Sequence, residues 1–247
     1  MSFAAGEPDQ LIREISPNDG MFDPDFPEAY FKVGESALHC IRLSLDAAGE
    51  STVDNILDFP CGHGRVLRTL KRAFPDAELT ASDIDHDGVD FCSETFGAKG
   101  VYSDHDLGKV DLEAGFDLIW VGSLFTHLPD SRWWSFLDFL IERLAPDGLL
   151  LFTVHGRWSA RQIREDRSPL AGSREAQLQM LRGFEASGFG FAGVGDQEAY
   201  GTSLTTPAAV LQRIQVFEDI RVLSYLERGW GSHQDVVACQ KGFAAPA

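Results

Sequence analysis

The stretch Asp58-Phe-Pro-Cys-Gly-His-Gly-Arg65, "DFPCGHGR", decides how this chain folds. An apolar run, "VDNIL" (53–57), precedes it, and a segment with helical spacing, "VLRTLKRAF" (66–74), follows it. A strand, a glycine-rich corner and a helix in this order are typical of a ligand site at the carboxyl edge of a parallel sheet. Gly62 and Gly64 let the backbone turn tightly and approach a ligand without a Cβ in the way.

Strands and helices alternate on both sides of this corner. The apolar patterns predict helices over 30–45, 65–74, 87–97 and 131–145, and strands over 55–59, 78–82, 100–103, 116–123 and 148–154. Near-continuous apolar strands between helices are typical of a parallel sheet covered by helices. Residues 220–230 and 235–242 predict two further strands joined by a short turn, which implies an antiparallel hairpin.

Composition excludes several classes of partner. The 247 residues predict one domain, and the net charge of -17 disfavours binding to nucleic acid or to an anionic membrane surface. No apolar run approaches the ~18 residues of a membrane span. The start "MSFAAGEPDQ" has no signal-peptide pattern, so we expect a cytoplasmic protein. The four cysteines form no metal-type spacing and are expected to be reduced, packed thiols.

Asp83 is the second part of the predicted ligand site. It closes the second predicted strand, where a carboxylate is well placed to accept hydrogen bonds from two ribose hydroxyls. A nucleoside-containing cofactor therefore fits. A dinucleotide fingerprint requires a third small residue where this chain has Leu67, which counts against NAD and FAD. S-adenosylmethionine, which needs no pyrophosphate seat, is the other candidate.

The corner and its surroundings resemble a class I S-adenosylmethionine-dependent methyltransferase over residues 53–155 and the terminal hairpin. The first motif of that family, acidic-x-Gly-x-Gly-x-Gly, corresponds here to Asp58-x-Pro60-x-Gly62-x-Gly64. Pro60 replaces the first glycine; proline has no N–H, so the corner must not need a donor there.

The resemblance implies a role for further residues and a particular fold. Asp83 would bind the ribose, Ile84 would contact the adenine, Asp104 would lie near the adenine amino group, and His127 would lie in a loop beside the cofactor. The implied fold is a doubly wound, Rossmann-like α/β sheet of seven mostly parallel strands in the order 3-2-1-4-5-7-6. Strand seven would be antiparallel, and helices would cover both faces.

Two histidines are candidate general bases for methyl transfer to a hydroxyl. His155 follows the strand over 148–154, and His233 precedes the last strand, so both are expected at the carboxyl edge of the sheet. We predict that one of them is the base, because histidine is the commonest residue in that role. Asp235, two residues on, is a candidate for orienting His233. For each histidine, a turn or packing role is the alternative.

Residues 156–216 form a predicted insertion with two interpretations. On a helix the first four of its arginines would share a face, and the fifth lies further on: Arg157, Arg161, Arg164, Arg167 and Arg174. This cluster would either bind an anionic acceptor or form a solvated face neutralised by neighbouring acids, and the pattern favours the solvated face. The turn-rich stretch over 199–207 is predicted to be a pocket wall or lid. Three aromatic residues are candidate walls for a sugar or planar ring, with core packing as the alternative: Tyr30, Trp158 and Tyr200.

The sequence thus predicts a single methyltransferase domain over 1–247, with a cap segment over 1–50 and an insertion over 156–216 that covers the acceptor pocket. Its expected function is S-adenosylmethionine-dependent methylation of a small molecule or glycan at a hydroxyl oxygen, with S-adenosylhomocysteine as product and no metal. The alternatives are a non-catalytic cofactor-binding or regulatory protein and an N- or C-methyltransferase of a natural product. The sequence does not predict an oligomeric state.

Overall fold

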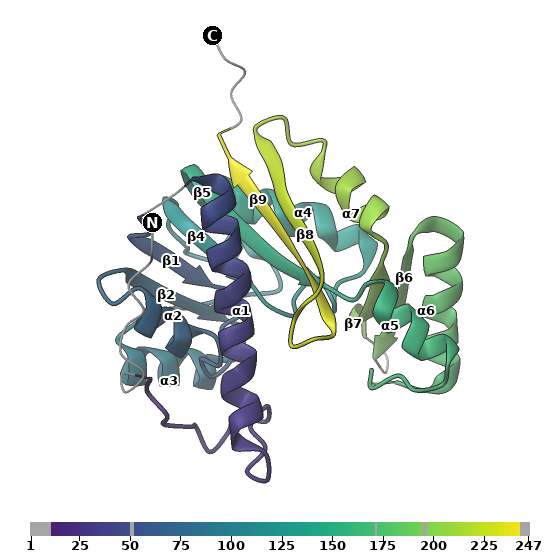
Figure 1. The fold of residues 1–247 in the computed structure, drawn as a ribbon, viewed down its shortest axis with the longest axis horizontal. Coiled ribbons are helices and arrows are strands. Elements are labelled where there is room, and N and C mark those ends of the chain that lie inside the picture. The colour runs from purple at the N-terminus through teal and green to yellow at the C-terminus, as the bar shows by residue number, and fades with distance from the viewer. Residues whose placement is uncertain (1–10, 50–51, 171, 195–196, 243–247) are drawn as a thin grey trace.

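A computed structural model describes residues 11–49, 52–170, 172–194 and 197–242, and strands alternate with helices along most of them (Figure 1). The helices are α1 (Pro27–Ala48), α2 (Leu67–Ala73), α3 (His86–Phe96), η2 (Leu107–Lys109), α4 (Asp130–Arg143), α5 (Arg157–Arg164), α6 (Arg174–Ser187) and α7 (Pro207–Ile214). The strands are β1 (Asn55–Asp58), β2 (Glu78–Asp83), β3 (Lys99–Tyr102), β4 (Phe116–Val121), β5 (Leu144–Val154), β6 (Phe189–Val194), β7 (Gln197–Thr205), β8 (Ile220–Trp230) and β9 (Gln234–Lys241).

The main sheet has seven strands in the order β3-β2-β1-β4-β5-β9-β8. Strands β1 to β5 pair in parallel, whereas β9 lies antiparallel to both β5 and β8. The predicted order is confirmed, because β8 and β9 are the sixth and seventh strands of this sheet. The carboxyl ends of β1, β2, β4 and β5 therefore meet at one edge, and β9 begins there.

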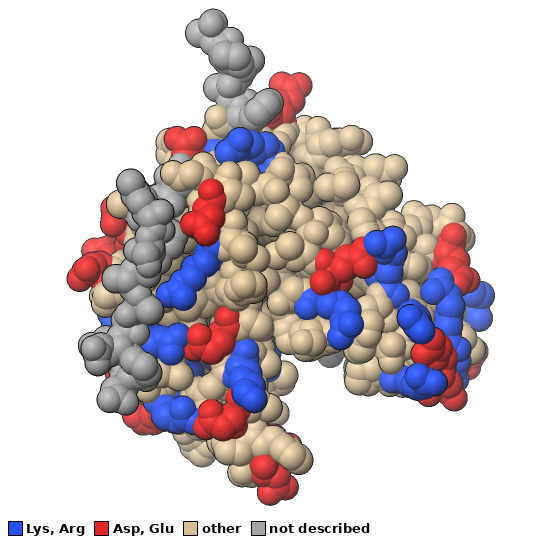
Figure 2. Space-filling view, in the orientation of Figure 1, with Lys and Arg blue, Asp and Glu red and all other residues tan. Residues whose placement is uncertain are grey.

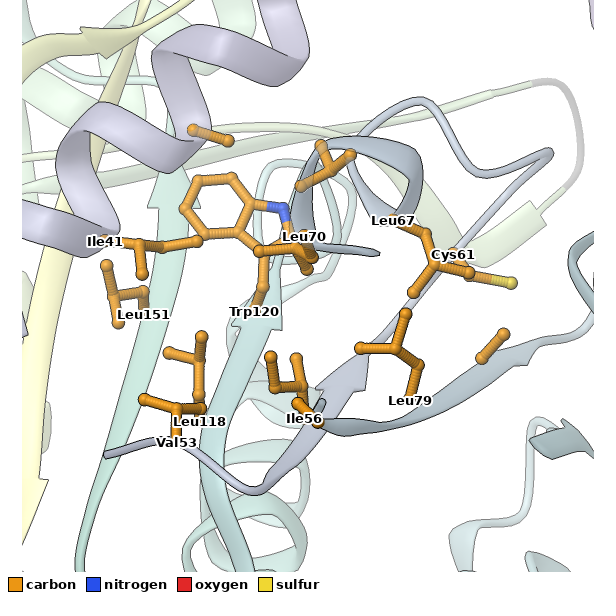
Figure 3. Close-up of a cluster of buried hydrophobic side chains, with 14 of the residues drawn as sticks. Ile41, Val53, Ile56, Cys61, Leu67, Leu70, Leu79, Leu118, Trp120 and Leu151 are labelled. Carbon is orange, nitrogen blue, oxygen red and sulfur yellow. The ribbon is translucent and has the colours of Figure 1, made fainter. Parts of the chain in front are cut away.

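Alternating side chains on the strands feed two separate cores. Ile56, Leu118 and Trp120 point to the face covered by α1, α2 and α3. Leu57 and Ile119, their neighbours in sequence, point to the face covered by α4 and α7. Figure 3 shows the first core, in which Trp120 lies under α1. The period-two pattern of the strands thus produces the three-layer fold that was predicted.

Four elements of the insertion form a small lobe beside the main sheet: α5, α6, β6 and β7 (Figure 1). Its own core includes Ile163, Met180 and Leu204. The glycine-rich stretch over 188–195 and the turn-rich stretch over 199–207, in which no strand was predicted, largely form the antiparallel pair β6 and β7. The glycines permit close packing: a Cβ on Gly190 would lie 1.8 Å from the Met180 carbonyl oxygen.

The amino-terminal segment, residues 11–26, crosses the corner between β1 and α2. Arg68 of α2 is 1% exposed and holds it there, donating to the carbonyl oxygens of Ile12 at 3.0 Å and Glu14 at 2.7 Å. The same guanidinium donates to the Gly64 carbonyl at 3.0 Å and to the Tyr30 hydroxyl at 3.4 Å. One buried arginine therefore joins the segment, α1 and the corner.

The remaining expectations about composition can be checked on the described residues. All four cysteines are buried, unpaired thiols, as predicted: Cys40, Cys61, Cys92 and Cys239. Within the described ranges no helix combines the length and apolar character needed to cross a bilayer.

Candidate functional site

The glycine corner between β1 and α2 has the backbone that its residues allow. Gly62 and Gly64 have φ values of +49° and +75°, a region that side chains disfavour. A Cβ on Gly64 would lie 2.3 Å from the Phe96 ring, so this glycine also permits packing on α3. A Cβ on Gly62 would meet no atom within 4 Å. Gly62 therefore borders open space, as expected of a residue that faces a ligand.

Asp83 ends β2 and is oriented by the backbone around it. Its Oδ2 accepts from the Gly62 N–H at 2.8 Å, and its Oδ1 accepts from the Asp85 N–H at 3.0 Å. Burial raises the pKa of this carboxyl, and the hydrogen bonds from the backbone oppose that rise. A carboxylate can accept about four hydrogen bonds, so Asp83 keeps acceptor capacity for a ligand.

Asp58 ends β1 and carries a buried oxygen without a partner. Its side chain is 2% exposed, and Oδ2 has no hydrogen bond within the described chain. Burial, and then the charge of Asp83, raises the pKa of Asp58 well above its ordinary value. An unsatisfied buried carboxylate costs stability, and such groups gather at binding sites. Asp58 thus suits a ligand that brings a cation or a hydrogen-bond donor.

Two cavities adjoin at this edge, and Pro60 and Asp83 line both of them. The larger cavity, of about 230 Å³, is also lined by Asp19, Met21, Asp58, Gly62, Arg65, Ser123, His127 and Trp230. The smaller cavity, of about 100 Å³, is also lined by Phe59, Ile84, Asp104, Leu124, Leu128 and Tyr200. An elongated ligand that spans both would pass over Asp83 at its middle.

The predicted cofactor residues meet here, with one exception. Those in the larger cavity are Asp58, Pro60, Gly62, Asp83 and His127, and those in the smaller cavity are Pro60, Asp83, Ile84 and Asp104. Gly64 lines neither cavity, and its described role is to pack the corner on α3. Pro60 forms a cis peptide bond with Phe59 and lies where the two cavities join.

His127 connects the main sheet to the small lobe. Its Nδ1 lies 2.6 Å from the Gly201 carbonyl oxygen, and its ring stacks on Tyr200 with centroids 5.0 Å apart. Burial lowers the pKa of His127, which favours the neutral imidazole. The N–H groups of Gly201 and Ser203 donate to the carbonyls of His127 and Thr126 at 3.0 and 2.8 Å. These backbone bonds fasten β7 to the loop after β4.

His155 and His233 lie near one another at the predicted edge, with ring centroids 6.5 Å apart. His155 is 4% exposed, and its Nδ1 has no partner in the described chain. Burial, followed by the charges of His127 and His233, lowers the pKa of His155 to about 3. His233 is half-buried, and its Nδ1 lies 2.9 Å from the Gly231 carbonyl oxygen. Both imidazoles lie outside the linings of the two cavities.

Asp235 does not orient His233, and that prediction is wrong. Its Oδ2 accepts from the Tyr225 hydroxyl and its Oδ1 from the Arg228 N–H, each at 2.9 Å. The two residues are only two apart in sequence, but a tight turn precedes β9 and Asp235 is buried on the sheet. Among the described residues no three His, Cys, Asp or Glu side chains gather into a metal-binding group.

The arginines of the insertion form a solvated, neutralised face rather than an anion site. Each one is paired with an acid: Arg157 with Glu227, Arg161 and Arg167 with Glu165, Arg164 with Glu185, and Arg174 with Asp166. Figure 2 shows blue and red side chains intermixed on the small lobe. Of the two interpretations of this cluster, the structure supports the solvated face that was favoured.

Sequence reasoning missed several polar groups of the larger cavity, among them Arg65, Asp19 and Ser123. Arg65 follows Gly64 directly, and its position beside the corner was an available signal. Asp19 comes from the amino-terminal segment, and no local pattern marks it. Ser123 accepts from the Gln234 amide at 2.9 Å, and Gln234 in turn accepts from the Thr153 hydroxyl at 2.6 Å. This chain of bonds joins the loop after β4 to β5 and β9 beside the cavity.

The fold and this site together define a class of protein. A seven-stranded sheet with one antiparallel strand, a glycine corner after β1 and an acid at the end of β2 are the features of class I S-adenosylmethionine-dependent methyltransferases. Residues 56–148 match the model of a methyltransferase domain. Residues 56–148 therefore carry a methyltransferase domain, and the fold around them is the one that solved S-adenosylmethionine-dependent methyltransferases share.

Individual relatives agree with this classification. A malonyl-[acyl-carrier protein] O-methyltransferase of Acetivibrio thermocellus is 27% identical over 137 residues, a match that covers 55% of this chain and 47% of that protein. The chain thus matches about half the length of that relative.

Solved structures share the fold. An S-adenosylmethionine-dependent methyltransferase of Clostridium acetobutylicum superposes with a TM-score of 0.57 at 13% identity, covering 86% of this chain and 92% of that one. Human N-acetylserotonin methyltransferase in complex with SAM superposes with a TM-score of 0.54 at 18% identity, covering 85% and 51%.

Proposed function

We propose that this chain binds S-adenosylmethionine across the two cavities and transfers its methyl group to a hydroxyl oxygen of a small molecule or glycan. The observation that carries the proposal is the pair of adjoining cavities that share Asp83, beside the unpartnered carboxylate oxygen of Asp58. The two carboxylates match the cofactor. Asp83 can accept hydrogen bonds from ribose hydroxyls, and Asp58 offers a negative charge to a cationic group of the ligand.

The cavities differ in ways that suggest how the cofactor would be held. The smaller cavity has apolar walls around Ile84 and Leu124, with Asp104 at its rim, and suits the adenine base. The larger cavity has several charged side chains and suits the methionine moiety. When bound, the cofactor supplies a methyl group already activated on a sulfonium, so alignment of the acceptor can provide most of the rate acceleration.

His233 is the better candidate for the general base, and His155 for a neighbour that positions the acceptor. If Nδ1 of His233 donates to the Gly231 carbonyl, the free lone pair is on Nε2, the tautomer a base requires. His155 is almost fully buried, and its low pKa keeps it neutral. A neutral imidazole with an unpartnered nitrogen can hydrogen-bond to a hydroxyl without removing its proton.

Two peripheral segments are proposed to frame the cofactor. Asp19 and Met21 of the amino-terminal segment line the larger cavity, and Tyr200 of the small lobe lines the smaller one. We therefore propose that Tyr200 contacts the cofactor, in place of the acceptor-wall role that the sequence predicted. The hydrogen bonds that fasten β7 favour a fixed wall over a mobile lid.

The first experiment measures cofactor binding by calorimetry on the full chain, with S-adenosylhomocysteine and NAD as titrants. Tight binding of S-adenosylhomocysteine alone supports the proposal, whereas binding of NAD alone overturns it. Turnover is then assayed with labelled S-adenosylmethionine against a panel of hydroxylated small molecules, sugars, amines and a malonyl thioester. The malonyl compound is included because the relative is named for that substrate. Cofactor binding without transfer to any acceptor would favour the regulatory alternative.

The base is tested with His233→Ala and His155→Ala, once an acceptor is found. We expect His233→Ala to lower kcat by about 100-fold or more. His155→Ala should raise KM for the acceptor more than it lowers kcat. Full turnover in both variants would reject the assignment while leaving cofactor binding intact.

A further inference from the structure

Arg65 is a cationic side chain in the larger cavity without a described partner. It follows Gly64, is half-buried, and its guanidinium lies over the Trp230 ring at 5.3 Å from the centroid. No hydrogen bond or ion pair joins it to any residue of the described ranges. Burial lowers the pKa of Arg65, although an arginine remains charged in proteins. Its N–H donors are thus held at the cavity wall without acceptors.

Arg68, three residues further on in α2, shows the contacts of an arginine with a structural role. Its guanidinium donates to carbonyls of Ile12, Glu14 and Gly64 and to the Tyr30 hydroxyl, so its donors are used within the protein. Arg65 lacks such acceptors. Buried cations are usually paired, because desolvation without compensation is costly. The difference between these neighbours indicates that the acceptor for Arg65 comes from outside the chain.

The other charges of the larger cavity narrow the chemistry of that acceptor. Asp19, Asp58 and Asp83 line it, so a ligand that was mainly anionic would be repelled. None of the three lies within ion-pair distance of Arg65. A ligand that carries cationic groups and a single carboxylate complements both the three aspartates and Arg65. The methionine moiety of S-adenosylmethionine has a sulfonium, an ammonium and one carboxylate.

We propose that Arg65 binds the carboxylate of the cofactor's methionine moiety and thereby distinguishes S-adenosylmethionine and S-adenosylhomocysteine from nucleosides that lack the amino acid. A guanidinium can bind a carboxylate through two parallel N–H bonds, which gives direction as well as strength. This assignment rests on the proposed function, since it places that cofactor in the larger cavity.

Calorimetry with two ligands isolates the contribution of the ligand carboxylate to binding. S-adenosylhomocysteine carries both the ammonium and the carboxylate, and S-adenosyl-3-thiopropylamine keeps the ammonium alone. We expect Arg65→Met to weaken binding of the first ligand by about 10- to 100-fold and of the second by less than about 3-fold. Arg65→Lys should lose an intermediate amount, because it keeps the charge without the fork. Arg72→Met is the matched control, since Arg72 lies on α2, which follows the turn that carries Arg65, but pairs with Glu35.

The outcomes separate this assignment from the proposed function. Equal weakening of both ligands in Arg65→Met would mean that Arg65 supports the shape of the cavity, and would overturn the assignment. Unchanged affinity for S-adenosylhomocysteine would overturn it as well, and would leave the cofactor site itself in place. A wild-type chain that binds neither ligand would overturn the proposed function and this assignment together. Should Arg65→Met fail to fold, the ratio of the two affinities in Arg65→Lys decides by the same criteria.

Discussion

Replacing Asp58 by asparagine should make the ligand-free protein more stable and the cofactor bind more weakly. Asp58 is 2% exposed, its Oδ2 has no described partner, and burial raises its pKa. Asparagine has the same shape without the charge. Relief of an unsatisfied buried carboxylate should raise the free energy of unfolding by about 1–3 kcal/mol at pH 7.5. Each kcal/mol should raise Tm by about 2–4 °C in a domain of this size.

The raised pKa of Asp58 determines how the stability gain of Asp58→Asn should change with pH. The folded protein binds a proton at Asp58 more tightly than the unfolded chain does, whose aspartate pKa is about 3.9. As pH rises from that value through the raised folded pKa, the carboxylate ionises in a site that opposes its charge, and stability falls. The stability advantage of Asp58→Asn over wild type should therefore grow with pH. Ionisation of Asp58 should have the opposite effect on ligand binding. The affinity for S-adenosylmethionine should rise over the same pH range in wild type, but not in Asp58→Asn.

The measurement is chemical denaturation of both proteins from pH 5 to 8, with calorimetry for S-adenosylmethionine at each pH. We expect Asp58→Asn to lose about 10- to 100-fold in affinity, consistent with removal of a charge partner in a partly buried site. Asp117→Asn is the matched control, because the Asp117 carboxylate accepts from the N–H groups of Asp54 and Asn55 at 2.9 Å. That exchange should destabilise the protein and leave affinity unchanged. A destabilised Asp58→Asn, or one whose advantage is constant with pH, would refute the reasoning.

Three further substitutions test how the site is built. Gly64→Ala should lower the free energy of unfolding by about 2–4 kcal/mol, measured by chemical denaturation. Gly97→Ala is the control, because Gly97 also has a positive φ, +67°, but no atom lies near the position of its Cβ, and it should lower that free energy by about 1–2 kcal/mol. Equal losses in the two variants would contradict the close packing of the corner. Arg68→Met should lower the free energy of unfolding by about 3–5 kcal/mol and speed proteolysis of the amino-terminal segment, whereas Arg72→Met should not. If the segment of Arg68→Met resists proteolysis as it does in wild type, other contacts hold it in place. Tyr200→Ala should weaken S-adenosylhomocysteine binding about 5- to 10-fold and Tyr200→Phe less than 2-fold by calorimetry, because we expect the aromatic ring of this lining residue to supply the contact. No loss of affinity in either variant would remove the small lobe from the cofactor site.

Much of the candidate site was predictable because its residues stand at the ends of predicted strands. Asp58 and Asp83 close β1 and β2, and parallel strands bring those ends to one edge. Ile84 and Asp104 follow β2 and β3 in the same way. For these residues, position along the chain and position in the fold are linked by the regular geometry of the sheet.

The small lobe was less predictable, and its glycines show why. A glycine-rich stretch is typical of turns, but Gly190 and Gly201 lie in paired strands that pack within reach of neighbouring backbone. The pattern alone does not distinguish a glycine that serves a turn from one that serves close packing. Asp235 shows the same limit, because its proximity in sequence to His233 predicted a contact that the turn before β9 prevents.

By itself the sequence determined the order and type of the main elements, since apolar periodicity records which faces of each strand and helix are buried, and adjacent glycines record where the backbone must turn. The tertiary structure alone decided which distant polar groups meet. It left Asp58 Oδ2 and the Arg65 guanidinium in one cavity without hydrogen-bond partners among the described residues, brought Asp19 to that cavity, and stacked Tyr200 of the small lobe on His127. Such meetings depend on how complete layers pack against one another, and no local pattern in a single chain records them.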